Sequence, residues 1–140
     1  MHYLNNLGKP PPVPHGEFWV EDGSGMRFRF WRFPIDARPI ITNAAYGMIS
    51  SAGLLSSANR LMYLGRAERL DRRLSGHEKL DRAKRLGANE LWVHQPMVGD
   101  PIPYWQVESR LIKRYSPPLN ENEPSPFPPL GALFGLGHAR

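Results

Sequence analysis

The sequence predicts an α/β fold of the α+β type, with a small three-stranded antiparallel sheet flanked by helices and an extra β-hairpin in front of it. Three observations support this prediction. Apolar and polar residues alternate over residues 26–31, as in a strand. Two strand-like segments, 40–49 and 61–64, flank a small, polar connection. Apolar residues with helical spacing follow this pair of strands and also follow a short apolar segment at 90–95. A chain of 140 residues is long enough for one core.

The composition narrows the classes of function. The chain has no cysteine, which excludes disulfides, zinc ribbons and thiol catalysis and fits a cytoplasmic location. Its apolar stretches are all shorter than the roughly twenty residues of a membrane span. The first residues lack the basic start and apolar centre of a secretory signal, so we expect no membrane association. A net charge of +5 is compatible with a polyanionic partner, although many small basic proteins bind no polyanion.

Residues 1–39 are expected to form a proline-rich arm and an accessory β-hairpin. The prolines at 10–14 favour a stiff, extended spacer. A Gly-rich connection at 22–25 joins the segments 17–21 and 26–31 as a hairpin. Alternation in the second segment puts Arg27, Arg29 and Trp31 on one face. Two roles stay open: the hairpin adds an edge to the main sheet, which is the simpler role, or it presents Arg27 and Arg29 to a nucleic-acid strand.

Residues 40–120 are expected to form the main domain. After the two strands, Leu70 and Leu74 lie four residues apart on one helical face, and Arg69, Arg73 and His77 form an adjacent stripe. Residues 75–76 break this helix, and a second helix covers 78–86. It ends at Gly87, which suits a left-handed cap.

A third strand is expected at 90–95, and a last helix starts at Pro103 and stops before residues 117–118. One face of that helix carries Trp105, Glu108, Ile112 and Tyr115. A carboxylate among apolar residues is costly unless it is paired or bound to a metal. Residues 121–140 form a tail rich in Pro and Gly, whose apolar patch docks either on the domain or on a protein partner. That patch comprises Leu130, Leu133, Phe134 and Leu136.

Several side chains of the main domain suit phosphodiester chemistry. A phenol (Tyr63), guanidinium groups (Arg66 and Arg73), an imidazole (His77) and a carboxylate (Glu108) occur within about sixty residues. Hydrolysis needs an activated water and neutralisation of phosphoryl charge. Magnesium requires only one or two protein carboxylates in addition to substrate phosphate. The set therefore suits a nuclease with a single metal ion.

The same segments resemble the signatures of a known family. Residues 63–65 read Tyr-Leu-Gly, and Arg66-Ala67 and a Leu-x-x-Arg-Leu segment at 70–74 follow, with His77 beyond them. Residues 111–120 end in Pro-Pro-Leu-Asn. In order and spacing this pattern resembles the GIY-YIG nuclease superfamily over residues 40–120. A smaller similarity, at 76–78 and 85–88, is to standalone bacterial or phage-type members.

The resemblance implies a fold and a set of roles. Glu108 would be the sole protein ligand of Mg²⁺ or Mn²⁺, and Asn120 would support the site. Arg73 would contact the scissile phosphate, with His77 nearby, and Arg66 would stabilise phosphate charge. Tyr63 would act as a base towards water if cations lowered its pKa.

The first family signature departs from the usual Gly-Ile-Tyr. Its position falls either on residues 44–46, which read Ala-Ala-Tyr, or on the shifted segment 47–49. We prefer Tyr46, because this alignment keeps the phenol. Arg69 and Arg72 are expected to contact either the nucleic-acid backbone or solvent.

The sequence therefore predicts a metal-dependent DNA endonuclease. A catalytically silent module of the same fold, binding nucleic acid or a protein, is the alternative. A small assembly protein is a third option that explains the termini but not the core. For the nuclease we expect the two tyrosines, Arg66, Arg73, His77 and Glu108 to meet on one concave, positively charged surface of the sheet.

Overall fold

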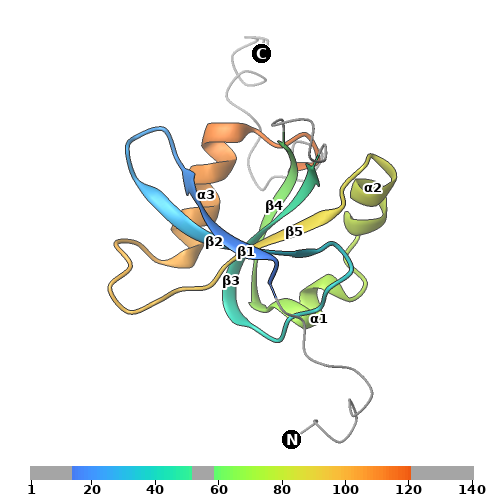
Figure 1. Cartoon of the computed structure of the whole chain (residues 1–140), viewed down its shortest axis with the longest axis horizontal. Coiled ribbons are helices and arrows are strands. Elements are labelled where there is room, and N and C mark those ends of the chain that lie inside the picture. The colour runs from blue at the N-terminus through green and yellow to red at the C-terminus, as the bar shows by residue number, and fades with distance from the viewer. Residues whose placement is uncertain (1–13, 52–58, 121–140) are drawn as a thin grey trace, which may run out of the picture.

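The computed structural model describes residues 14–51 and 59–120, and this part of the chain forms five strands and three helices (Figure 1). In order these are β1 (Gly16–Glu21), β2 (Arg27–Pro34), β3 (Thr42–Ser51), β4 (Asn59–Arg69), α1 (Leu70–Leu74), α2 (Leu80–Arg85), β5 (Glu90–His94) and α3 (Tyr104–Tyr115). The expected α+β class is confirmed. The first thirteen residues and the tail patch lie outside the described residues.

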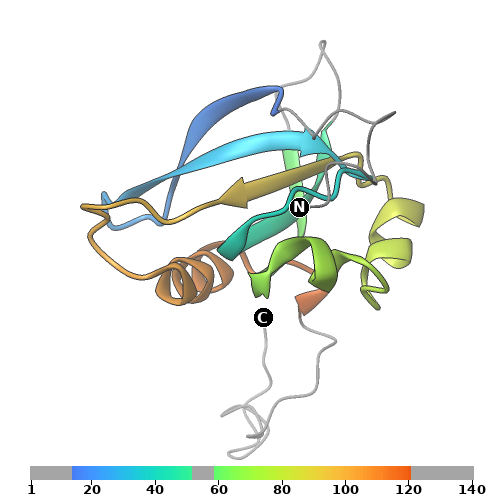
Figure 2. The same ribbon diagram turned by 90° about the horizontal axis from the view of Figure 1, so that it is seen from below.

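The strands form one antiparallel sheet in the order β1-β2-β5-β3-β4. The expectation of a three-stranded sheet is wrong because β2 pairs along β5, with Trp31 opposite Val93 and Phe33 opposite Leu91. The N-terminal hairpin thus extends the main sheet, which is the simpler of its two predicted roles. Figure 2 shows β1 on the side of the molecule away from α1 and α3.

Each face of the sheet has its own core. One core lies under α1 and α2 and includes Tyr46, Tyr63, Leu70 and Leu74. The other core lies under α3 and joins Val107 and Leu111 to residues of β2, β3 and β4. Figure 1 shows α3 and the α1–α2 pair on opposite sides of β3 and β4. A residue on β4 therefore faces one helical layer or the other, depending on its place in the alternation.

Strand β4 is longer than predicted and shortens the helix that follows it. Its pairing with β3 continues to Arg69, which lies opposite Thr42. Helix α1 therefore covers only residues 70–74, and Gly76 adopts a positive φ of 77° just after it. The predicted helical stripe of Arg69, Arg73 and His77 is wrong, because His77 lies in the turn beyond α1.

The ends of the other helices follow the sequence more closely. Gly87 has a φ of 106° just after α2, as its predicted role as a left-handed cap requires. Helix α3 follows Pro103 and ends at Ser116, whose φ is 46°. The predicted apolar face of α3 is partly wrong: its buried side chains are Val107 and Leu111, whereas Trp105 and Tyr115 are exposed. None of the helices in the described ranges has the length and apolarity needed to cross a membrane.

Candidate active site around strand β4

A buried hydrogen bond joins β3 to the turn after α1. The hydroxyl oxygen of Tyr46 lies 2.7 Å from Nε2 of His77, and both side chains are buried. The backbone N–H of Lys79 donates to Nδ1 of His77 at 3.0 Å. Since Nδ1 accepts this bond, Nε2 carries the proton of the neutral imidazole and donates it to the Tyr46 oxygen.

Tyr63 extends this contact into a cluster of three rings. Its ring centroid lies 5.1 Å from that of His77 and 6.1 Å from that of Tyr46. A side-chain hydrogen bond also links the two tyrosines. Because the Tyr46 oxygen accepts from His77, its own proton is available to Tyr63. The result is a directed chain of hydrogen bonds from Lys79 through His77 and Tyr46 to Tyr63.

Burial sets the protonation of this chain. Desolvation raises the pKa of Tyr46 above its ordinary value, and the neighbouring Tyr63 raises it further, while Arg73 opposes this rise. Tyr46 is therefore a neutral phenol in this structure. Desolvation also lowers the pKa of His77 to about 4, and the charge of Arg73 lowers it as well. Both groups thus act as neutral hydrogen-bonding partners near pH 7.

Gly65 lies where any larger residue would overlap two tyrosine side chains. A Cβ atom added there would lie 2.7 Å from Cζ and the hydroxyl oxygen of Tyr46 and 2.8 Å from Cε2 of Tyr63. Tyr46 also lies directly opposite Gly65 in the strand register. Gly47, in the shifted alternative, approaches Leu61 and Leu64 instead. Tyr46 rather than Gly47 therefore packs against Gly65, and its place in the first family signature stays a prediction.

Arg73 lies at the exposed rim of this cluster and is paired with an acid. Its two terminal nitrogens donate to the two carboxylate oxygens of Glu78 at 3.2 and 3.1 Å. Hydrogen bonding from Arg73, together with its charge, lowers the pKa of Glu78 to about 2. A phosphate that binds Arg73 through the same planar donors has to replace Glu78. In the sequence, the only signal for this pair is that Glu78 follows Arg73 by five residues.

Arg66 and Glu108 lie on the other face of the sheet. Side chains alternate along β4, so Tyr63 and Gly65 face α1 while Leu64 and Arg66 face α3. Nε of Arg66 lies 3.9 Å from Oε1 of Glu108, whose side chain is 17% exposed. The expectation of one surface on one face is therefore wrong: the structure gathers Tyr46, Tyr63, Arg73 and His77 on one face and Arg66 and Glu108 on the other.

The outer edge of β4 lies between these two groups. Strand β4 is the last strand of the sheet. The side chain of Asn120 accepts from the backbone N–H of Leu64 at 2.9 Å and donates to its carbonyl at 2.8 Å. Leu119 adds a backbone bond to Met62 at 3.0 Å. Asn120 thus pairs with the edge as a neighbouring strand would and fixes it between Tyr63 and Arg66.

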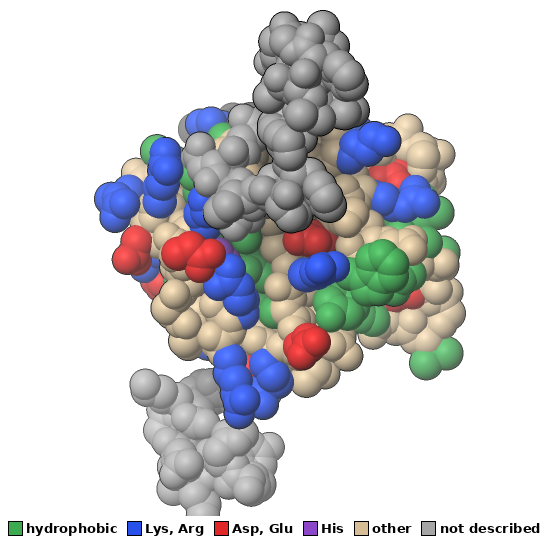
Figure 3. All heavy atoms as spheres, turned by 180° about the vertical axis from the view of Figure 1, so that it is seen from behind, with side chains coloured by type: hydrophobic (Ala, Val, Ile, Leu, Met, Phe, Trp, Pro, Cys, Tyr) green, Lys and Arg blue, Asp and Glu red, His purple; other side chains and the backbone are tan. Residues whose placement is uncertain are grey.

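The remaining predicted contacts are distributed over the surface. Arg69 forms two hydrogen bonds of 3.1 Å with Asp71, so it is already paired, and Arg72 is exposed. On the face drawn in Figure 3, basic and acidic side chains are intermingled, and the expected continuous positive surface is absent from this view of the described residues. The physical reason is that Arg66, Arg69 and Arg73 each lie beside a carboxylate.

The donor atoms limit the kind of metal site that β4 can form. Among the described residues, no three His, Asp or Glu side chains come together as a cage of ligands. Glu108 is a partly buried carboxylate of α3 that lies beside Arg66 of the edge strand. Mg²⁺ needs only one or two such ligands when substrate phosphate supplies others. The residues present therefore fit a cation held jointly by Glu108 and a substrate.

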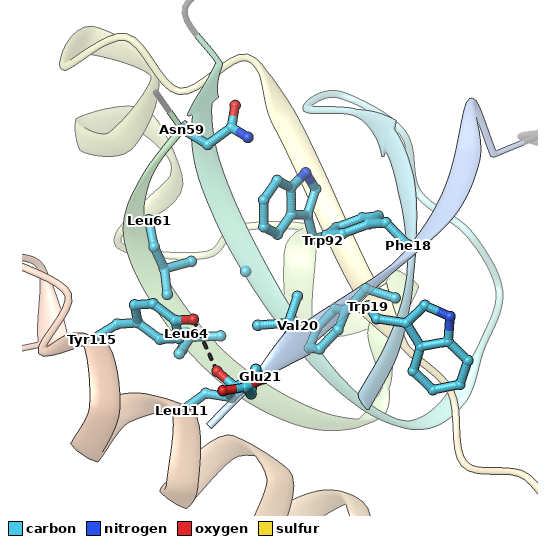
Figure 4. Close-up of a pocket in the computed structure, with 12 residues that line it drawn as sticks. Phe18, Trp19, Val20, Glu21, Asn59, Leu61, Leu64, Trp92, Leu111 and Tyr115 are labelled. Carbon is cyan, nitrogen blue, oxygen red and sulfur yellow. Dashed lines mark hydrogen bonds between the residues drawn. The ribbon is translucent and has the colours of Figure 1, made fainter. Parts of the chain in front are cut away.

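A separate apolar cavity of about 330 Å³ lies on the α3 face. Figure 4 shows Trp92, Leu61 and Leu111 around it and the hydrogen bond of 2.9 Å from the Tyr115 hydroxyl to the carbonyl of Glu21. Its lining includes neither Arg66 nor Glu108. This cavity is therefore distinct from the candidate site along β4.

Comparison with known proteins gives no assignment: no protein-family model, curated protein or solved structure matches the chain.

Proposed function

We propose that the protein is a metal-dependent endonuclease that hydrolyses phosphodiester bonds in DNA at the edge of strand β4. The observation that carries the proposal is the set of side chains that flank this edge. Tyr63 and Arg73 lie on one face of the sheet, and Arg66 and Glu108 lie on the other. Asn120 holds the backbone between them. A cytoplasmic location and the resemblance to GIY-YIG nucleases belong to the same proposal.

The two faces supply different parts of the chemistry. Arg66 and Arg73 provide cations on both sides of an edge-bound phosphate, which stabilises charge that develops during hydrolysis. Glu108 would hold Mg²⁺ or Mn²⁺, which lowers the pKa of bound water and neutralises phosphoryl charge.

Tyr63, rather than Tyr46, is the better base towards water. Tyr46 is kept neutral by burial and donates its proton towards Tyr63, and a hydrogen bond donated to a phenol oxygen favours its ionised form. Tyr46 and His77 would therefore be positioning residues. They orient Tyr63 and do not themselves take a proton.

The direct test is a plasmid-nicking assay on purified protein with Mg²⁺ or Mn²⁺, with EDTA as the metal-free condition. Glu108→Gln keeps the size of the side chain but removes its charge, and we expect a loss of nicking of on the order of a hundredfold or more. DNA binding by this variant should be unchanged or stronger, since a negative charge is lost near phosphate. Glu68→Gln, which removes an exposed carboxylate of β4, is the matched control. Nicking by Glu108→Gln at the wild-type rate would refute the assignment of the ligand.

A catalytically silent module that binds nucleic acid or a protein is the second candidate. The pairing of Arg73 with Glu78 favours it, because this arginine is already occupied by an acid. The two candidates differ in one result: a silent module binds DNA without metal-dependent nicking.

A further inference from the structure

The apolar cavity of about 330 Å³ on the α3 face has no part in the proposed nuclease chemistry. Its lining comes from all five strands and from α3 (Figure 4). Glu21 is the one charged residue among the described residues that line it. Arg27 and Arg29 of the hairpin alternate to the other face of β2, so they do not contribute to this cavity. The cavity is therefore an apolar site that is separate from both sets of predicted nucleic-acid contacts.

The polar atoms of its aromatic walls are already used in hydrogen bonds. Nε1 of Trp92 donates to the Glu90 carboxylate at 2.9 Å, and the Tyr115 hydroxyl donates to the carbonyl of Glu21 at 2.9 Å. Trp92 also packs edge-on against Phe18, with the ring centroids 4.3 Å apart. A polar ligand would lose its hydrogen bonds to water without gaining a donor from these two rings, whereas an apolar side chain loses none. The lining therefore favours an apolar occupant.

The size and exposure of the cavity fit a few side chains rather than a large cofactor. Its volume lies at the lower end of the range of small-molecule sites, which is roughly 300–1,000 Å³. Phe18, Leu61 and Trp92 are only partly buried in its walls. Covering this surface is favourable in proportion to the apolar area removed from water.

The chain itself carries an apolar segment that starts close to this cavity. The side chain of Asn120, the last described residue, is hydrogen-bonded to the backbone of Leu64, and Leu64 lines the cavity. Residues 130–136 read Leu-Gly-Ala-Leu-Phe-Gly-Leu and carry no charge. The chain from residue 120 to residue 130 can span at most roughly 35 Å. This reach is several times the width of a cavity of this volume, so the segment can enter it from Asn120.

We propose that residues 130–136 of the same chain dock in this cavity, with Phe134 as the side chain that enters it. The Phe134 ring packs against Trp92 and Phe18, as aromatic rings do in edge-to-face clusters. Attachment at Asn120 keeps the segment at a high effective concentration beside the cavity, so weak contacts are enough to hold it there. Of the two predicted roles of the tail, this inference selects docking on the domain. It does not rest on the proposed nuclease function.

The test is disulfide formation in the full chain, which has no cysteine of its own. Ala132→Cys places one thiol within the segment and keeps all of its large side chains. Asn59→Cys places the other at an exposed position in the lining of the cavity. The control pair combines Ala132→Cys with Arg72→Cys, which is also exposed but lies on α1, on the other face of the sheet. Under mild oxidation we expect the disulfide within one chain to form about tenfold faster in the first pair. Non-reducing electrophoresis and mass spectrometry measure this rate.

Two further variants of the first cysteine pair test which side chain enters the cavity. Phe134→Ser should reduce the rate of disulfide formation to that of the control pair. Phe127→Ser removes a phenylalanine of the tail outside residues 130–136 and should leave the rate unchanged. Equal rates for the two cysteine pairs, or equal effects of the two phenylalanine variants, would overturn the proposal. So would disulfides that form mainly between chains, because the cavity would then take the tail of a second copy.

Binding of a fluorescent dye to apolar surface is a second measurement that needs no cysteine. Leu133→Ser combined with Phe134→Ser in the full chain should uncover the cavity and raise dye fluorescence several-fold, whereas Phe127→Ser should not. Unchanged dye binding by the double variant would show that the segment does not cover the cavity. Both measurements are made without DNA or metal ions. A failure of tail docking therefore leaves the nuclease proposal intact, and a failure to nick DNA leaves tail docking intact.

Discussion

Nε2 of His77 donates to the hydroxyl oxygen of Tyr46 at 2.7 Å, across 31 residues of sequence and within a buried cluster. The direction of this bond follows from the Lys79 backbone N–H, which occupies the other ring nitrogen. The bond leaves the hydroxyl proton of Tyr46 to be donated towards Tyr63, and its effects on stability and pH dependence do not require a substrate.

Tyr46→Phe removes the acceptor and leaves the N–H of His77 buried without a partner. We expect the free energy of unfolding, measured by urea denaturation, to fall by roughly 1–3 kcal/mol. Tyr115→Phe is the control, because it removes the hydroxyl of an exposed tyrosine that donates to Glu21. A loss no greater for Tyr46→Phe than for this control would contradict the buried hydrogen bond.

Stability should fall as the pH falls from about 6.5 to about 4. The folded pKa of His77 is about 4, below its ordinary value of 6.5, so the unfolded chain binds the proton more readily within this window. The contribution is complete above pH 6.5 and is lost as the pH approaches 4, with a total of roughly 3 kcal/mol. His77→Gln cannot titrate, so its urea midpoint should vary less over the same window. Parallel curves for the two proteins would show that His77 is not the group responsible.

Gly65→Ala should destabilise the protein by roughly 1–3 kcal/mol, because the new methyl group would overlap the two tyrosine rings. Gly16→Ala provides the matched control, since a Cβ there meets nothing within 4 Å. Thermal denaturation of both variants measures the difference. If Gly65→Ala were as stable as Gly16→Ala, the rings could not lie as close to this strand as they do here.

Glu78→Gln should strengthen DNA binding by releasing Arg73 from its paired carboxylate. Asp81→Asn removes one negative charge from the same segment and is the control, because the ion pair of Arg73 is with Glu78. We expect several-fold tighter binding at low salt for Glu78→Gln beyond that of the control, with the gain diminishing as salt screens phosphate contacts. Equal affinities of the two variants would mean that Arg73 does not bind phosphate.

Local patterns predicted the elements well where neighbouring residues decide the structure. Alternation predicted the β2 strand, Gly87 predicted the left-handed residue after α2, and Pro103 predicted the start of α3. The preference for Tyr46 over the shifted segment also came from the sequence and stays a prediction; the structure places the Tyr46 ring against Gly65. These features depend on periodicity and backbone geometry, which a short segment carries by itself.

The tertiary structure alone decided how these elements combine. The pairing of β2 with β5 joins the hairpin to the main sheet, and strands this far apart in sequence carry no local signal for it. A step of one residue along β4 moves a side chain to the other face, so Tyr63 and Arg66 separate although the sequence places them together. His77 reaches Tyr46 because α1 ends early, and the burial that results keeps both groups neutral. The sequence therefore determined which chemical groups are present. Long-range strand pairing determined which face of the sheet each group occupies, and burial determined the protonation states of Tyr46 and His77.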